Sequence, residues 1–185
     1  MASITKSPGT VVDAGGGSVA WSNPDNAKAS DNTYATIYLG PQGGDYYTNY
    51  LQATNFGFNI PAGNIIIGIL VAIKKARTCE AYTGITTSAV RLVKNGTIVG
   101  NNYCDSLWPA SDTYSYHGGS NDLWGLTLTV SDVNSANFGV VLQAEIWSAT
   151  LPPGGAVTGY VDHIQMTVYY APPPSINGAI LLMQL

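Results

Sequence analysis

Apolar positions follow a strand-like pattern along much of the chain, and the pattern is strongest in residues 65–73. The odd-numbered positions from Ile65 to Ile73 are all isoleucine or valine, and the even-numbered positions between them are apolar as well. Because side chains alternate between the two faces of a strand, both faces of this segment are apolar. We therefore expect it at the centre of the fold, or with its outer face covered by the chain's tail or by another chain.

Three further segments carry strand signals. Residues 89–100 place apolar runs on either side of Asn95-Gly96, a dipeptide that suits a two-residue hairpin turn because both residues tolerate positive φ. Residues 138–146 and 163–170 each alternate apolar with polar positions, and three consecutive prolines end the second of these segments. Shorter strands are expected at residues 10–13, 34–39 and 50–58, and a single helical turn at residues 131–137 with Ser131 as its cap.

Clusters of Gly, Pro, Asn and Asp separate these segments, and no strand alternates with a helix. Seven to nine short strands in this arrangement predict an all-β fold, an antiparallel β-sandwich of jelly-roll type. A chain of 185 residues suits one domain. We expect an N-terminal arm over residues 1–10, the jelly-roll sandwich over residues 11–170, and a proline-containing apolar tail over residues 171–185.

The apolar side chains of this tail would be a liability if they were exposed to water. We therefore expect the tail to dock on a neighbouring subunit of a homo-oligomer, with a trimer as the first candidate. The expected subunit contacts are Ile180, Leu181, Leu182, Met183 and Leu185.

Charged residues make up only 10% of the chain, and the formal net charge is -4. Lys74, Lys75 and Arg77 are the densest basic group, which is too small to neutralise a run of phosphates, so a nucleic-acid partner is not expected. The apolar run at residues 64–73 is shorter than the roughly 20 residues of a membrane helix. No membrane partner is therefore expected. The start of the chain also lacks the apolar core of a secretory signal.

Two cysteines, Cys79 and Cys104, bracket the predicted hairpin. The sequence leaves two alternatives open, a disulfide across the end of the sandwich or two reduced thiols. Their spacing is not that of a zinc or redox motif, and no metal or other cofactor is expected.

Candidate catalytic groups are few. His117 and His163 are the only histidines, no nucleophile elbow lies near either, and both are expected at the solvated surface. Glu80 and Glu145 are the only glutamates, whereas most aspartates lie in turn sequences where the side chain bonds its own backbone. We therefore expect no enzyme activity and no catalytic residues.

Residues 23–32 form an oxygen-rich loop that contains three asparagines and two aspartates. Calcium favours such oxygen ligands, but the loop lacks the spacing of an EF-hand and has no glutamate nearby. Turn chemistry therefore explains this composition better than a metal site does.

Several segments in order resemble a β-sandwich domain of phage and prophage structural proteins. They read VAWSNPDNAKASDNTYA, ATNFGFNIPAGNIIIGILVAIKKA, VRLVKNGTIVG, GGSNDLWGLTLTVSDVNSANFGVVLQA and VDHIQMTVYY. The resemblance covers about residues 11–170 and implies a virion-associated role, such as a capsid decoration protein, a head fibre or a tail appendage. It implies other virion proteins as partners and a location in the virion, which is assembled in the host cytoplasm and released by lysis; a protein that is not viral would belong at an extracellular surface.

Carbohydrate binding is the alternative function, because β-sandwiches can present aromatic side chains on which sugar rings stack. The chain could then be a carbohydrate-binding module or a host-surface adhesin. The glycan contacts expected from the sequence are Tyr103, Trp108, Tyr114 and Tyr116. In contrast, Trp21, Trp124 and Trp147 are expected to pack in the core or at sheet edges.

Overall fold

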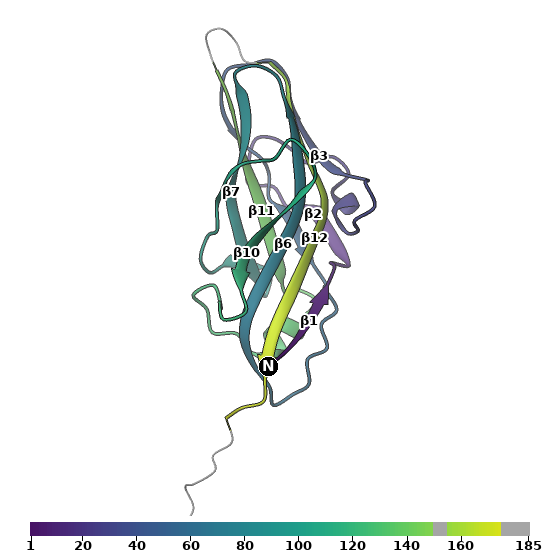
Figure 1. The fold of residues 1–185 in the computed structure, drawn as a ribbon, viewed down its shortest axis with the longest axis vertical. Coiled ribbons are helices and arrows are strands. Elements are labelled where there is room, and N and C mark those ends of the chain that lie inside the picture. Colours follow the sequence, from purple (N-terminus) through teal and green to yellow (C-terminus); the bar gives the residue numbers. More distant parts are fainter. Residues whose placement is uncertain (150–154, 175–185) are drawn as a thin grey trace, which may run out of the picture.

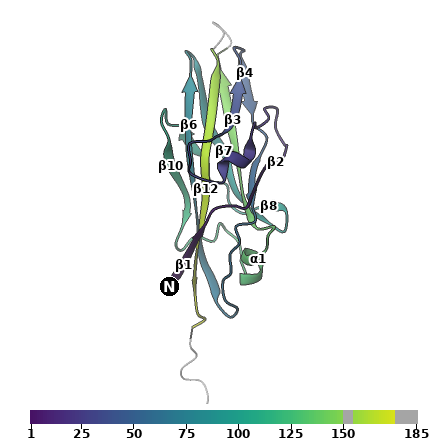
Figure 2. The same ribbon diagram turned by 90° about the vertical axis from the view of Figure 1, so that its right-hand side faces the viewer.

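The computed structural model describes residues 1–149 and 155–174, and these form two antiparallel β-sheets packed face to face (Figure 1). Figure 2 shows the two layers from the side, with β6, β10 and β12 in one and β2 and β8 in the other. The predicted antiparallel β-sandwich of jelly-roll type is confirmed. The described residues contain twelve strands, more than the seven to nine expected, because the structure adds strands of three to five residues at the sheet edges.

One sheet has five strands. The order β1-β12-β6-β10 forms its main path, and β3 pairs with the opposite end of β12. The strands of this sheet are β1 (Ala2–Lys6), β3 (Ala35–Leu39), β6 (Ile65–Cys79), β10 (Thr113–Gly119) and β12 (Val157–Ala171).

The other sheet has seven strands. The order β2-β5-β11-β7-β8 forms its path, with β4 also paired to β11 and β9 also paired to β7. The strands of this sheet are β2 (Thr10–Asp13), β4 (Gly44–Tyr47), β5 (Leu51–Thr54), β7 (Thr83–Lys94), β8 (Thr97–Val99), β9 (Asp105–Leu107) and β11 (Gly139–Ser148).

Strand β6 lies between β12 and β10, which agrees with the central position predicted from its two apolar faces. Ile69, Val71 and Ile73 are fully buried in the core between the sheets. Because side chains alternate, Lys75 continues this inward series, whereas Lys74 belongs to the outward one. Two neighbouring lysines therefore lie on opposite faces of the same sheet.

The predicted hairpin forms between β7 and β8, and its turn residues Asn95 and Gly96 have φ of 53° and 77°. The inward positions of the strand predicted at residues 138–146 are buried in β11, as predicted. In β12 the side chains that face the core resume at Ile164 after Val161, because the pairing with β6 shifts between Val161 and His163. This β-bulge brings two consecutive side chains to the outer face, where they take part in the site described below.

Several local expectations need correction. Residues 2–6 of the expected N-terminal arm form the edge strand β1 along β12, and Ile4 packs on the core (Figure 1). The cap of the short helix α1 (Val130–Asn134) lies two residues earlier than expected, because Thr129 and Asp132 form a reciprocal capping box in place of a Ser131 cap. Residues 24–27 of the oxygen-rich loop form the 3-10 turn η1 (Pro24–Ala27).

The described residues include no helix that is long and apolar enough to cross a membrane. The expected subunit contacts at residues 180–185 lie outside the described residues.

Candidate functional site

The outer face of the five-stranded sheet is polar and aromatic. Strand pairing places Tyr160 of β12 beside Thr36 of β3 and Ala76 of β6 in one row across the sheet. The next row of outward-facing side chains combines His163 of β12, Lys74 of β6 and Tyr114 of β10. These side chains are not part of the core between the sheets, so they are available to the surface or to loops that cover it.

A hollow of about 350 Å³ opens on this face. It is lined by Tyr34, Ala76, Ala110, Ser111, Asp112 and Tyr160. The rings of Tyr34 and Tyr160 meet edge to face, with centroids 5.5 Å apart and planes at 73°. The hollow therefore has two aromatic walls, small side chains between them, and a hydroxyl and a carboxylate at its rim.

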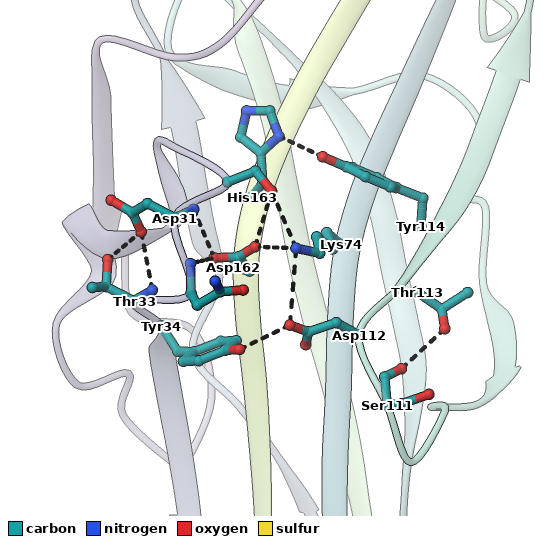
Figure 3. A network of polar contacts seen from close by, with 12 residues as sticks. Asp31, Thr33, Tyr34, Lys74, Ser111, Asp112, Thr113, Tyr114, Asp162 and His163 are labelled. Carbon is teal, nitrogen blue, oxygen red and sulfur yellow. Dashed lines mark hydrogen bonds and ion pairs between the residues drawn. The ribbon is translucent and has the colours of Figure 1, made fainter.

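The Asp112 carboxylate is held at the hollow by Tyr34, whose hydroxyl donates a hydrogen bond to it over 2.8 Å (Figure 3). This hydrogen bond raises the pKa of Tyr34 above its ordinary value, since ionisation of the phenol would place a second negative charge beside the carboxylate. The Lys74 ammonium lies 3.9 Å from the same carboxylate. Asp112 thus remains an acceptor at the edge of an aromatic hollow.

Asp162 fixes the loop that carries Tyr34. Its fully buried carboxylate accepts hydrogen bonds from the backbone amides of Asp31 and Asn32, at 3.3 and 2.8 Å, and from the Ser30 hydroxyl at 3.2 Å. The Lys74 ammonium donates to it over 2.7 Å, which raises the pKa of that lysine. Because its carboxylate accepts four hydrogen bonds, Asp162 has a structural role. The positive charge of Lys74 is paired with this carboxylate.

His163, the second residue of the β-bulge, lies between Tyr114 and Ser7. The Tyr114 hydroxyl is 2.8 Å from Nδ1 (Figure 3). The Ser7 hydroxyl is 2.8 Å from Nε2. These neighbours leave His163 only 7% exposed, so the expectation of a solvated histidine is wrong here. Burial lowers its pKa, because the charged imidazolium loses hydration.

Tyr114 and Tyr116, two of the glycan contacts expected from the sequence, lie on this same outer face. Both belong to β10, and their rings are stacked with centroids 6.2 Å apart. Tyr116 is 64% exposed, whereas Tyr114 is half-buried against His163. The pair extends the aromatic surface beyond the hollow along the edge of the sheet.

The other two expected glycan contacts lie elsewhere. Trp108 is 1% exposed, and its indole donates to Thr87 within the core, so this residue cannot form a surface contact. Tyr103 packs edge to face on Trp124 and donates to the carboxylate of Asp122. These two aromatic residues contribute to packing and not to the outer face.

Three other expectations concern chemistry. His117, expected at the surface, is 4% exposed because strand β10 turns it inward toward the core. Cys79 and Cys104 are free thiols in the structure, which corrects the disulfide alternative. Within residues 1–149 and 155–174 no group of three His, Cys, Asp or Glu side chains is arranged to hold a metal ion.

The outer face of the seven-stranded sheet also exposes aromatic side chains. The ring of Trp147 lies over Gly84 of the neighbouring strand and is 39% exposed. Tyr47 donates from its hydroxyl to Glu145 over 3.1 Å. These two aromatic residues lie on the opposite face of the sandwich from the hollow lined by Tyr34 and Tyr160.

No protein-family model matches the chain, and no curated protein matches it either. Solved structures with a similar arrangement include a CBM4 module, which is 9% identical with a TM-score of 0.36 and coverage of 88% of this chain and 92% of that one. The module TmCBM61, solved with β-1,4-galactotriose, is 10% identical with a TM-score of 0.38, covering 89% and 86% of the two chains. Tailspike protein 4 of bacteriophage CBA120 is 10% identical with a TM-score of 0.36, but the match covers 88% of this chain and 19% of the tailspike chain. These likenesses concern the fold alone.

Proposed function

We propose that this protein is a non-enzymatic binding module that recognises neutral carbohydrate on the outer face of its five-stranded sheet. The observation that carries the proposal is the hollow between Tyr34 and Tyr160, with Asp112 and Ser111 at its rim. Aromatic rings stack on the apolar faces of sugar rings, and carboxylate and hydroxyl oxygens accept hydrogen bonds from sugar hydroxyls. The hollow combines both kinds of group within about 350 Å³, the lower end of the range of ligand pockets.

The charges around the hollow favour a neutral ligand. Lys74 is the cation beside it, and the ammonium is paired with Asp162 at 2.7 Å and lies 3.9 Å from Asp112. One positive charge therefore faces two negative ones, which leaves a local excess of negative charge. An acidic sugar would be repelled at this position, whereas a neutral hexose would not.

The length of the aromatic surface suggests how an oligosaccharide would lie. The first ring would occupy the hollow against Tyr160, and further rings would extend along β10 over the exposed face of Tyr116. Neither histidine contacts the ligand in the proposed complex, and no catalytic step is proposed. His163 is covered by Tyr114 and Ser7, and His117 lies in the core.

A glycan array of neutral and sialylated oligosaccharides tests this function. We expect the intact protein to bind neutral glycans, and Tyr160→Ala and Tyr116→Ala to weaken binding by about tenfold, a loss of about 1.4 kcal/mol. Tyr82→Ala is the matched control, because Tyr82 is 61% exposed but lies in the turn between β6 and β7. Selective binding of sialylated glycans, or equal losses in all three variants, would contradict the proposal.

A role in a virion is a second candidate, and the ordered sequence resemblance to phage and prophage structural proteins supports it. The two functions are compatible, since a binding module in an appendage would attach a particle to a host surface glycan. Assembly through subunit contacts, with a trimer as the first candidate, stays a prediction. Light scattering of the full chain tests it, and a monomer at all concentrations would contradict it.

A further inference from the structure

A second cluster of polar groups lies inside the sandwich, on the opposite side of β6 from the hollow. Lys75 is 2% exposed, and its ammonium nitrogen lies 2.6 Å from Oδ2 of Asp105 and 2.7 Å from the hydroxyl of Thr87. Trp108 covers it, with the ring centroid 5.2 Å from Nζ. Lys75 belongs to the five-stranded sheet and Asp105 to β9 of the seven-stranded sheet, so the contact bridges the two layers.

The contact has two features that an ordinary ion pair does not explain. Oδ1 of Asp105 is buried without a hydrogen-bond partner, although buried carboxylate oxygens are normally paired. The Lys75 amine is held between Thr87 and Asp105 under an indole ring, in surroundings where a charged group loses most of its hydration. Burial lowers the pKa of Lys75, which favours the neutral, nucleophilic amine.

His117 supplies a third group next to the reacting atoms. Its Nε2 lies 3.6 Å from Oδ2 of Asp105, the same oxygen that contacts the lysine, and 3.2 Å from the Ser115 hydroxyl. Desolvation by burial lowers the pKa of His117 to about 4, so the ring is neutral near pH 7 and can accept a proton and return it.

We propose that Lys75 and Asp105 condense in the folded protein to form an intramolecular amide bond between the two sheets. The ammonium first gives a proton to the Asp105 carboxylate, and the neutral amine attacks the carboxyl carbon to form the Nζ–Cγ bond. His117 takes the second proton from nitrogen and passes it to the departing oxygen. The Cγ–O bond then breaks and one water molecule leaves, so an ammonium and a carboxylate become an amide and water with no oxidant or reductant.

The buried setting supplies the driving force that water lacks. In water, hydration of the two ions opposes condensation, whereas inside the sandwich the Lys75 side chain is 2% exposed and Oδ1 of Asp105 is buried. The amide replaces two buried charges with one neutral group and removes the carboxylate whose second oxygen has no partner. The bond would tie the two sheets together covalently in a protein whose two cysteines are free.

Intact-mass spectrometry of the purified full chain under denaturing conditions tests the proposal. We expect a mass one water molecule below that of the sequence, and the full sequence mass for Lys75→Arg. Asp105→Asn should lose one ammonia molecule instead, because the amine would then displace an amide. His117→Gln should slow the reaction, so that freshly refolded protein contains a mixture of both masses.

Lys74→Arg is the matched control, because Lys74 contacts Asp162 at 2.7 Å on the outer face, where that carboxylate also accepts hydrogen bonds from two backbone amides and a hydroxyl. This variant should keep the loss of water. Tryptic mapping should find no cleavage after Lys75 and one peptide pair joined through Lys75 and Asp105. The full sequence mass in the intact protein, or a water loss that maps to a succinimide elsewhere, would overturn the proposal and leave a non-covalent ion pair.

Discussion

Lys74 and Lys75 are neighbours in β6, and each forms a short ion pair with an aspartate, at 2.7 and 2.6 Å. Lys74 faces outward, with 18% of its side chain exposed, and hydrogen bonding to Asp162 raises its pKa. Lys75 faces inward, with 2% exposed, and burial lowers its pKa. The two ion pairs therefore have different roles. The outer pair holds the loop that carries Tyr34 to the hollow, and the inner pair connects the two sheets.

The comparison shows that contact distance alone does not define the role of an ion pair. On the outer face, the Asp162 carboxylate is saturated by donors that position the Tyr34 loop. In the core, one oxygen of Asp105 has no partner and a histidine lies next to the other. Substitutions in the two pairs should therefore change stability by different amounts.

Loss of the inner lysine should have the largest effect. Lys75→Met removes the partner of a partly buried carboxylate, and we expect the free energy of unfolding to fall by about 3 kcal/mol. Urea denaturation followed by tryptophan fluorescence measures this change, since Trp108 lies in the cluster. An effect as small as that of a surface lysine would show that the inner pair contributes little.

Replacing both Lys75 and Asp105 distinguishes a covalent bond from a non-covalent ion pair. In the double variant Lys75→Met with Asp105→Leu, a non-covalent pair would be exchanged for apolar packing and most of the lost stability would return. If the intact protein contains a covalent bond between the sheets, the double variant cannot replace it. The free energy of unfolding should then remain about 2 kcal/mol or more below that of the intact protein. Urea denaturation of the double and single variants distinguishes the two outcomes.

Acid should weaken the inner cluster through His117. Its pKa is about 4 in the folded protein, below the ordinary histidine pKa of 6.5, so below pH 6.5 the unfolded state binds a proton that the folded state does not. Stability should therefore be full above pH 6.5 and fall by about 3 kcal/mol as the pH drops to about 4, with no further loss from this group below that.

His163 also has a lowered pKa and should add a loss in the same direction. Unfolding of His117→Gln and His163→Gln across this pH range separates the two contributions. We expect the slope to flatten more in His117→Gln, and an unchanged slope in that variant would contradict the assignment.

Asp162→Ala should loosen the outer face. The change removes the acceptor of two backbone amides, a hydroxyl and an ammonium, and we expect about 2 kcal/mol of destabilisation. Hydrogen exchange should accelerate at Asp31 and Asn32 but not at the core amides of β11. Because Tyr34 follows in the same loop, glycan affinity should fall as well, although Asp162 does not line the hollow.

Lys74→Gln should have the smallest effect. The ammonium is partly solvated, and after the change the buried Asp162 carboxylate keeps its three other hydrogen-bond donors, so we expect a loss of about 1 kcal/mol. Calorimetric unfolding of this variant beside Lys75→Met completes the comparison. Equal losses in both variants would mean that the two faces of β6 provide the same environment, contrary to the account.

The local pattern of the sequence predicts much of the fold. The two apolar faces of residues 65–73, the Asn95-Gly96 turn and the alternation in residues 138–146 and 163–170 all form as expected, because each depends on residues close in the chain. The same alternation, continued along β6, would have placed Lys74 and Lys75 on opposite faces. Tyr160 and the acceptor Asp112 could not be recognised as neighbours, since strands and loops distant in sequence build the hollow.

The burial of the two histidines could not be predicted from the sequence either. His163 lies beside Asp162 on the outer face because of a β-bulge, which shifts the alternation without a signal from Gly or Pro. His117 is buried because β10 pairs with β6 at the register that opposes His117 to Val71. Trp108 was expected near the surface because it follows a turn, but Thr87 in the core accepts a hydrogen bond from its indole.

The central claim is that the hollow on the outer face binds neutral sugar, and an NMR titration tests it most directly. The intact protein would be titrated with a panel of neutral hexose oligosaccharides while the ring signals of its tyrosines are followed. We expect saturable shifts at Tyr34, Tyr160 and Tyr116, with Tyr82 unchanged. Shifts centred on Trp147 and Tyr47 of the other sheet, or no shifts with any neutral oligosaccharide, would contradict the claim.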